Sequence, residues 1–393
     1  MALAAVEQTG TQGLIHHRHI YRPLFVSMLL TIAGCVQFPV DPPAIHSPDV
    51  VFPAPPPVTR LGEYRVYYGD LHNHTLLSDG TGMPEDAYSY ARDMGHMDFF
   101  GLSDHEWVMT DSSWAYTRRI ADAFNENNRF VTFCGFEWSS MRYGHCTVTA
   151  TDSFCYSTDD TSSTTTFSGL CTWLSTHDCI AFFNHPGRIA TADEFNLFAS
   201  EPSDGIVGME LWNKTASFFP YYYNDGFYLN DHNRSFYDEA LLRGWNIGAA
   251  GGGDNHWASW GTITDSRIAV LAQALTREDI LDAFRARRFY STLDRNLVMS
   301  FTADDHEMGS TVYGPAHSIR IRAIDMNDEY FTTALLFNGN HDTVRIWNDR
   351  TTDFSASMEY ATDHDDYLYV LLRQEDGGEA ISSPVWIRPA VKE

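Results

Sequence analysis

The chain has 393 residues, of which 44% are hydrophobic, enough to bury one large core and a smaller module. Its 52 acidic residues outnumber its 26 basic ones, which gives a formal net charge of −26 with no visible basic run. This balance argues against a nucleic-acid partner, because phosphate backbones are bound by clustered positive charge. An anionic substrate would be repelled at long range unless local positive charge, such as bound metal ions, attracts it.

The N-terminal segment is typical of a secretory signal. Arg18 and Arg22 precede an apolar stretch at 23–34 that is too short to span a bilayer as a mature helix. Cys35 follows Ala33 and Gly34 as in a bacterial lipobox, which predicts cleavage before Cys35 and lipidation of its thiol. The alternative is a plain signal peptide with an incidental cysteine. We therefore expect residues 1–35 to direct an exported bacterial lipoprotein, periplasmic or at the cell surface, anchored to a membrane through Cys35.

A proline-rich segment at 36–60 follows this signal. It carries eight of the 16 prolines, including Pro55, Pro56 and Pro57. Such a composition predicts an extended, semi-rigid tether.

Apolar strands alternate with helix-like segments over residues 61–293, which predicts βα units and a parallel sheet. Thr276 and Asp279 stand in capping-box spacing at the start of the last predicted helix. The predicted helices cover 84–94, 114–124 and 276–288. The predicted strands cover 65–69, 99–103, 130–136, 179–183, 206–211, 247–250 and 267–272.

Five cysteines follow Cys35: Cys134, Cys146, Cys155, Cys171 and Cys179. An odd number in an oxidising compartment suggests one or two disulfides and a free thiol, and Cys155 could pair with Cys171 or with Cys179. Cys146 follows His145 directly. On a strand its side chain would point to the opposite face, which favours apolar packing over metal binding.

Most of the predicted strands end in a potential metal ligand. His72 and His74, at positions i and i+2 of an extended segment, point the same way and can hold one cation, with Asp79 able to reach back. Alone, this pair could equally be incidental at a polar strand end, but similar residues recur downstream in Asp104-His105, Glu137, Asn184-His185, Glu210 and Asp254-Asn255-His256. Polar residues at the carboxyl ends of parallel strands mark the active face of a βα barrel. Gly251, Gly252 and Gly253 would let the backbone approach a bound group.

After residue 293 the sequence pattern changes: it predicts strands with alternating apolar and polar residues, and no helices. Strands are predicted at 297–302, 318–324, 330–336, 344–347, 354–360, 367–373 and 385–387. This spacing predicts a small β-sandwich over 294–393 that caps the barrel or binds carbohydrate. The predicted fold class is thus α/β, a barrel followed by a sandwich.

The strand ends together supply six histidines and three acidic residues: His72, His74, Asp79, His105, Glu137, His145, His185, Asp254 and His256. This set exceeds the needs of one ion and suits two or three ions that share a carboxylate. Closely spaced cations lower the pKa of a bridging water and neutralise an attacked oxyanion.

The motifs GDLHNHTLLSDG, GLSDHE, GFEWSS with YGHCTV, FNHPGR and GGGDNHW occur in the order seen in the polymerase and histidinol phosphatase (PHP) superfamily. The ending, RRFYSTLDRN with AISSPVWI, resembles the carbaryl-hydrolase-like branch. The resemblance covers about residues 64–389. It implies a distorted seven-stranded βα barrel around a trinuclear site of zinc, manganese or iron, where a metal-bridging hydroxide attacks a small-molecule ester.

Carried over by motif, the resemblance assigns a first metal to His72, His74, Glu137 and Asp254. Glu137 would bridge to a second metal held by His145 and His185, and Asp79, His105 and His256 would hold the third. Glu137 and Asp254 would be catalytic. Arg188 could contact a substrate anion or form a structural salt bridge.

Residues around these ligands receive lesser roles. Asp70 and Asp104 fit orienting partners of the neighbouring histidines, and Trp138 and Trp257 could wall the pocket or simply pack. The leading reaction is phosphoester cleavage. The alternatives are cleavage of a carbamate or carboxylic ester, and a noncatalytic binding lipoprotein that contains metal.

Overall fold

Strands Tyr64–Asp70 (β2), Phe99–Leu102 (β3) and Val131–Ser140 (β4) begin the chain's main sheet as parallel neighbours in the computed structural model. The structure describes residues 60–158, 162–187, 195, 198–213, 227 and 235–389. The predicted signal peptide, Cys35 and Arg188 therefore lie outside the described residues. Among the described residues no helix is long and apolar enough to cross a membrane.

Further strands extend this sheet on both sides. Beyond β4 follow β5 (Gly144–Thr149), β6 (Ile180–Phe183), β7 (Ile206–Asn213) and β8 (Gly248–Gly252). Beyond β2 follow β9 (Arg267–Ala272) and β10 (Phe289–Thr292). Their order across the sheet is β10-β9-β2-β3-β4-β5-β6-β7-β8. β5 runs antiparallel to both neighbours, so β4, β6, β7 and β8 share one direction with β2. The predicted strands of this region are present, whereas β5 and β10 were not predicted.

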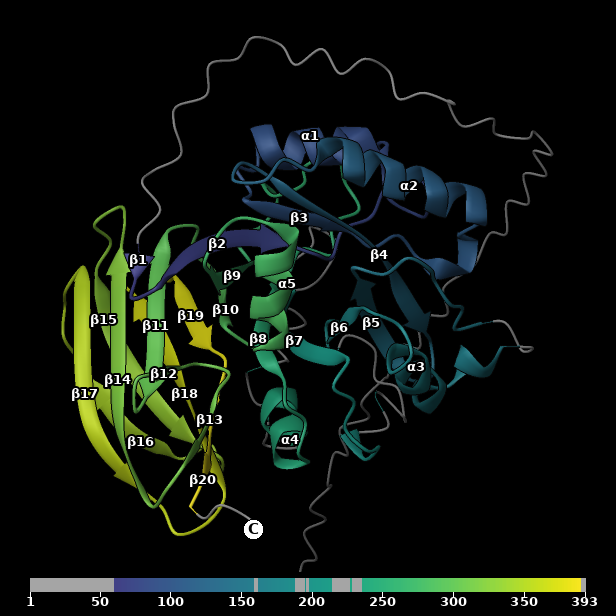
Figure 1. Ribbon diagram of the computed structural model, residues 1–393. Helices are drawn as coiled ribbons and strands as arrows, with labels where there is room; N and C mark the ends of the chain where they lie inside the picture. Colours follow the sequence, from purple (N-terminus) through teal and green to yellow (C-terminus); the bar gives the residue numbers. More distant parts are fainter. Residues whose placement is uncertain are drawn as a thin grey trace, which may run out of the picture. The chain divides into compact units, whose positions relative to one another are not determined.

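Helices pack beside this sheet. They are α1 (Pro84–Asp93), α2 (Asp111–Phe124), α3 (Phe167–Leu174), α4 (Phe236–Leu242) and α5 (Arg277–Arg285), with short 3₁₀ turns at Glu106–Val108 and Ser163–Thr165. α1 and α2 lie side by side next to β3 and β4 (Figure 1), where Tyr88 stacks against Phe124. The predicted cap of α5 is present, since the Thr276 hydroxyl accepts a hydrogen bond from Asp279 N at 3.1 Å.

The fold is confirmed as mixed α/β, but a closed barrel is not. Within the described part of the chain, no hydrogen-bonded ladder joins β8 to β9 or β10. The Ser383 side chain connects β8 to β10 instead. Ala249 N of β8 donates to the Ser383 hydroxyl at 3.1 Å, and this hydroxyl donates to the Phe289 carbonyl of β10 at 2.5 Å.

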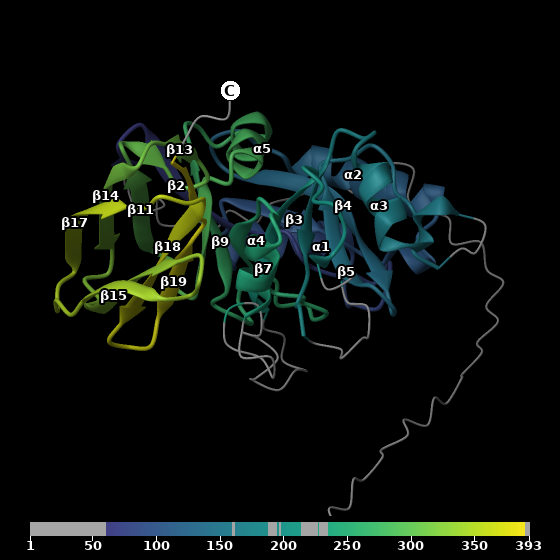
Figure 2. The ribbon, with the colours of Figure 1, turned by 90° about the horizontal axis from the view of Figure 1, so that it is seen from below.

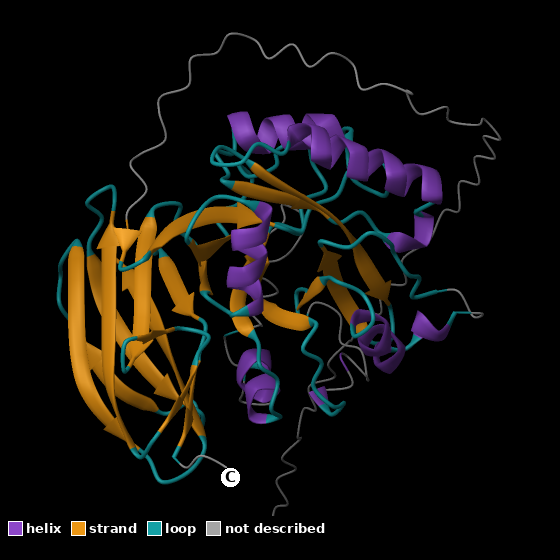
Figure 3. Ribbon diagram, viewed as in Figure 1, coloured by secondary structure: helices purple, strands orange, loops and turns teal. Residues whose placement is uncertain are grey.

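The C-terminal strands form two packed layers, and Figure 3 shows no helix among the described residues there. One layer is a four-stranded sheet in the order β12 (His306–Glu307), β11 (Leu297–Ala303), β14 (Ala316–Asp325) and β17 (Asp353–Ala361). The other holds β13 (Thr311–Tyr313), β15 (Phe331–Asn338), β16 (Thr343–Trp347), β18 (Asp366–Gln374), β19 (Glu379–Ser382) and β20 (Val385–Arg388). Their facing side chains share one apolar core, as in a sandwich.

The second layer continues directly into the α/β sheet (Figure 2), because β19 pairs antiparallel with β10 and Ser291 lies opposite Ile381. The apolar core is shared in the same way: Val66, Leu271 and Tyr290 pack in one cluster with the sandwich residues. The domain boundary between residues 293 and 294 stays a prediction.

The expectation of disulfides was wrong. None of the five described cysteines forms a disulfide: Cys134, Cys146, Cys155, Cys171 and Cys179. Most of them are buried among apolar side chains, where a cysteine packs as a small hydrophobic residue. Cys146 is fully buried in that core, as its place on the strand predicted.

Candidate metal centre

All nine predicted ligands meet at one end of the sheet. His72, His74 and Asp79 follow β2, and His105 follows β3. Glu137 and His145 lie on β4 and β5, His185 follows β6, and Asp254 and His256 follow β8. Their donor atoms fall into four groups that could each hold a cation: His74, Asp79, His105 and His256; His72, His185 and Asp254; His72, His74 and Glu137; and Glu137, His145 and His185.

Glu137 lies at the centre of these groups and is completely buried. Its two carboxylate oxygens face different imidazoles. Oε1 is 3.1 Å from His72 Nε2, 3.2 Å from His145 Nδ1 and 3.2 Å from His185 Nε2. Oε2 is 2.9 Å from His105 Nδ1 and 3.7 Å from His74 Nε2. The carboxylate therefore has the placement of a group shared between two cations.

Two further carboxylates complete the cluster. Asp254 Oδ1 is 3.3 Å from His72 Nε2 and 3.1 Å from His74 Nε2. Asp79 Oδ1 is 3.2 Å from His256 Nε2, and its side chain is 45% exposed. The cluster thus reaches solvent on the side of Asp79 and His256, while its other members are buried.

A β-hairpin explains the short spacing between Glu137 and His145. β4 turns directly into β5, so that Ser139 lies opposite His145 in an antiparallel register. Side chains alternate along both strands, so His145 shares the face of Glu137 while Cys146 points into the apolar core.

Glu210, in the middle of β7, is a site residue whose role the sequence did not reveal. Its Oε1 lies 2.7 Å from His72 Nδ1, and its Oε2 accepts hydrogen bonds from His185 N at 2.8 Å and Asn213 Nδ2 at 2.7 Å. A carboxylate on Nδ1 fixes the ring and leaves Nε2 directed at the cluster. The only signal in the sequence was the position of Glu210 near a strand end.

The glycine run before Asp254 makes room for side chains of this chain. A Cβ on Gly252 would lie 2.0 Å from Glu210 Oε1, and one on Gly253 would lie 2.6 Å from Asp70 Oδ2. The glycines therefore admit Glu210 and Asp70.

The two aspartates beside the histidines differ from each other. Asp70 Oδ1 accepts a hydrogen bond from His72 N at 2.9 Å, as an orienting partner should. Asp104 instead binds the Thr75 backbone and hydroxyl and the Ser78 hydroxyl, so it fixes the loop after His74 rather than the neighbouring ring.

The pKa shifts show how strongly the cluster favours positive charge. Burial opposes protonation of His105, but the carboxylates of Glu137 and Asp79 outweigh it and raise the pKa of His105 to about 10. Burial would raise the pKa of Glu137, yet the imidazoles around it hold that pKa well below its usual range. At His74 burial prevails and lowers the pKa to about 3. Neutral His74 beside ionised carboxylates is the protonation state of a metal site.

The donor set fits divalent cations. Both ring nitrogens of His74 and Nε2 of His145 are buried and make no hydrogen bond to the described residues. Such buried polar atoms are costly unless something binds them. Imidazole nitrogens mixed with carboxylate oxygens suit zinc, manganese or iron.

The tryptophans near the cluster in sequence differ in their exposure to solvent. Trp138 is fully buried and its indole donates to the Thr164 carbonyl at 2.9 Å, so it packs rather than lines a pocket. Trp257, next to His256, is 50% exposed. Trp107 is 47% exposed and its ring centroid lies 5.6 Å from that of His105.

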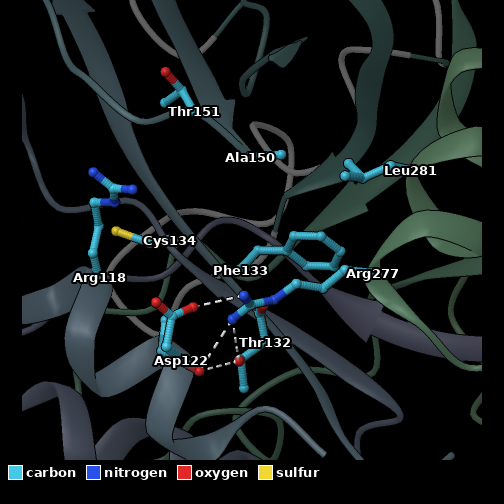
Figure 4. Close-up of a pocket in the computed structure, with 10 residues that line it drawn as sticks. Arg118, Asp122, Thr132, Phe133, Cys134, Ala150, Thr151, Arg277 and Leu281 are labelled. Carbon is cyan, nitrogen blue, oxygen red and sulfur yellow. Dashed lines mark hydrogen bonds and ion pairs between the residues drawn. The ribbon is translucent and has the colours of Figure 1, made fainter. Parts of the chain in front are cut away.

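A separate cavity of about 210 Å³ lies between α2, β4 and α5 and shares no residue with the cluster. In Figure 4 the Arg277 side chain points to Asp122 and Thr132, to which its guanidinium is bonded at 2.6 Å and 3.2 Å. Its charge is therefore already neutralised, and we assign no function to this cavity.

No protein-family model matches the sequence. An uncharacterized protein of Chlamydia pneumoniae is 22% identical over 360 residues, which are 81% of this chain and 57% of that protein. The chain thus spans little more than half the length of this curated relative.

Two solved structures are similar to this chain. A two-domain protein of Bacteroides vulgatus containing a predicted PHP-like metal-dependent phosphoesterase has a TM-score of 0.47 and 15% identity, covering 84% of this chain and 98% of its own. PsfC from Pseudomonas syringae has a TM-score of 0.34 and 14% identity, covering 52% and 82%. At these values neither likeness identifies the family or the activity of this chain.

Proposed function

We propose that this chain is a metal-dependent hydrolase of small-molecule esters, with phosphoesters as its leading substrates. The observation that carries the proposal is the buried carboxylate of Glu137, whose two oxygens face separate sets of imidazoles. A carboxylate shared in this way fits a centre of two or more ions, whereas one structural zinc takes four ligands and needs no bridge.

The ligand allocation that we propose follows the four donor groups. His72, His74, Glu137 and Asp254 would hold one ion, and Glu137, His145 and His185 a second. Asp79, His105 and His256 would hold a third, with His74 close enough to contribute. The order of the motifs in the PHP superfamily supports the same division.

The chemistry at this centre divides between cations and side chains. When bound, divalent cations would act as Lewis acids and make water a nucleophile near neutral pH. Glu210 holds the His72 ring in place through Nδ1, and Glu137 balances the charge between the donor groups. We assign to Asp254 the acceptance of the proton that an attacking water loses. The exposed Asp79 marks the side from which a substrate would enter.

The exposed indoles favour a second candidate reaction, the hydrolysis of aryl carbamates or carboxylic esters. Trp107 offers an exposed apolar face 5.6 Å from the His105 ring, and the exposed Trp257 directly follows His256 in the chain. An aromatic leaving group would pack there without needing local positive charge.

A substrate panel separates these reactions from a third possibility, a noncatalytic metal-containing binding protein. The purified protein, with manganese or zinc added, is assayed on p-nitrophenyl phosphate, bis-p-nitrophenyl phosphate and 1-naphthyl carbamate. We expect phosphoester turnover that a chelator abolishes and added metal restores. Turnover of the carbamate alone would favour the second reaction.

The matched control in this panel is Glu137→Gln, prepared in the same way, which exposes any contaminating hydrolase. A wild-type protein with full metal content that turns over none of the three substrates would contradict the proposal of an enzyme.

We also propose that the chain is exported and held on a membrane by a lipid on Cys35. The support is the lipobox at 32–35 followed by the proline-rich tether. Cys35→Ser should move the protein from the membrane fraction to a soluble exported or uncleaved form, measured by fractionation and immunoblotting. Unchanged membrane partitioning of this variant would contradict lipidation.

A further inference from the structure

The Ser139 hydroxyl lies against two members of the histidine cluster. Ser139 follows Glu137 by two positions on β4, so their side chains share one face of the strand. Its Oγ is 2.6 Å from His105 Nδ1 and 2.9 Å from the Glu137 carbonyl oxygen. The side chain is only 5% exposed, so water competes little for these contacts.

The partners of this hydroxyl determine where the protons lie. A carbonyl oxygen can only accept, so the single hydroxyl proton points to the Glu137 carbonyl and a lone pair faces His105 Nδ1. Glu137 Oε2, which is 2.9 Å from the same nitrogen, also can only accept when the carboxylate is ionised. Two acceptors therefore face His105 Nδ1, and this nitrogen must carry a proton.

The other ring nitrogen of His105 is left for a cation. A histidine that binds a metal is neutral, so a proton on Nδ1 leaves the lone pair on Nε2. His105 Nε2 is 3.5 Å from Asp79 Oδ2, and the other oxygen of Asp79 is 3.2 Å from His256 Nε2. The lone pair of His105 thus faces the group to which we assign the third ion.

A buried carboxylate fixes the backbone of Ser139. Glu106 begins the 3₁₀ turn that follows His105 and is completely buried. Its Oε2 accepts a hydrogen bond from Ser139 N at 3.0 Å, while its Oε1 accepts from Ser157 N at 3.0 Å and from the Ser157 hydroxyl. Glu106 therefore ties the strand that carries Ser139 to the turn that follows His105.

We propose that Ser139 is a positioning residue for the third ion: its hydroxyl keeps the His105 proton on Nδ1 and so directs Nε2 to the cation, while Glu106 holds Ser139 in place. The inference deepens the proposed function and rests on the ligand allocation given there. Neither Ser139 nor Glu106 belongs to the four donor groups, so both act through His105 rather than on the ion. Orienting partners of metal-bound histidines contribute about 10- to 100-fold in metal affinity.

Metal titration of the full-length Ser139→Ala variant tests this role without any measurement of turnover. The metal-free protein is titrated with manganese or zinc, and bound metal is measured by elemental analysis as a function of free metal. We expect the wild type to bind three ions. Ser139→Ala should bind two of them with unchanged affinity and the remaining ion about 10- to 100-fold more weakly. The circular dichroism spectrum of the metal-free variant should be that of the wild type.

Two further variants separate positioning from a general loosening of the β4–β5 hairpin. Ser139→Thr keeps the hydroxyl and suits a strand, so it should retain the third ion. Ser140→Ala is the matched control, because the neighbouring Ser140 is also 5% exposed and its hydroxyl accepts a hydrogen bond from Tyr143 N at 3.2 Å. This control should bind all three ions as the wild type does.

The possible outcomes distinguish this proposal from the proposed function. Wild-type affinities for all three ions in Ser139→Ala would overturn the role of Ser139, as would equal losses of affinity in Ser139→Ala and Ser140→Ala. Fewer than three ions in the wild type would refute the third ion and this proposal with it. A wild-type protein that binds three ions but hydrolyses none of the panel substrates would refute the proposed hydrolysis alone.

Discussion

Glu137 is the single residue on which the charge balance of the histidine cluster depends most. Glu137→Gln keeps the shape of the side chain but removes its charge and replaces one oxygen by an amide nitrogen that cannot bind a metal. Two cations a few ångströms apart would then lose their shared counter-charge, so at least one should be lost. We expect lower metal content and a fall in kcat of roughly a hundredfold or more, with the circular dichroism spectrum unchanged.

His256→Ala should have a narrower effect, because His256 lies at the exposed edge and contacts Asp79 and Asp254 but not Glu137. We expect it to lose one ion and keep two. Glu126→Gln, which changes an exposed carboxylate paired with Arg129, is the matched control. Wild-type metal content and turnover in Glu137→Gln would refute the shared carboxylate.

Glu210 should act through His72 rather than on a substrate. Glu210→Gln weakens the bond to His72 Nδ1 but can retain those to His185 N and Asn213. We expect metal affinity to fall about 10- to 100-fold, with KM nearly unchanged once excess metal is supplied. A large change in KM at saturating metal would instead indicate direct contact with substrate.

The sequence predicted the nine clustered residues because each belongs to a short motif at or beside a strand end, and because histidines recur there. It did not predict the role of Glu210, since nothing local distinguishes a carboxylate that holds an imidazole from one that lines a pocket. It misread Asp104 for a related reason: adjacency to His105 in sequence does not decide which way a buried carboxylate points.

Among the secondary-structure elements, the β4–β5 hairpin shows which strands the sequence pattern can predict and which it cannot. The strand before Glu137 was predicted from its apolar run, whereas β5, with Gly144, His145 and Thr147, has too mixed a composition to stand out. The register of the hairpin still decides the site, because a slip of one residue would exchange the faces of His145 and Cys146.

The spacing between β7 and β8 leads to a prediction about Gly252. A Cβ there would overlap Glu210 Oε1, and three hydrogen bonds keep that oxygen's carboxylate from moving away. Gly252→Ala should therefore lower Tm by several degrees and weaken metal binding together.

A double variant identifies the cause of this effect. Adding Glu210→Ala to Gly252→Ala should recover much of the lost Tm, since the overlap disappears, while metal affinity stays low. Additive losses of Tm in the double variant would show that Glu210 is not the obstacle.

For the whole molecule, the continuous sheet predicts that the two regions fold as one unit. Deleting residues 297–393 would remove β19, the partner of β10, and expose Val66, Leu271 and Tyr290. We expect the truncated protein to aggregate, as judged by size-exclusion chromatography. A soluble truncated chain with full metal content and activity would show that the sandwich is dispensable.

The change of sequence pattern near residue 293 predicted a sandwich and most of its strands, but it predicted neither β12, β13 and β19 nor how the sandwich joins the rest. Strand pairing between β10 and β19 connects residues about ninety positions apart, and neither strand carries a local signal for its partner. Ser383 illustrates the same limit, since a hydroxyl that spans β8 and β10 looks like any loop serine in the sequence.

The pairing of β10 with β19 also restricts the order in which the chain can fold. During synthesis the segment up to Thr292 leaves the ribosome first, yet one edge of β10 stays unpaired until Ile381 has emerged. The nascent chain therefore carries an open strand edge through the translation of the next ninety or so residues. We expect slow, largely post-translational folding and a need for chaperone protection of that edge until the final strands arrive.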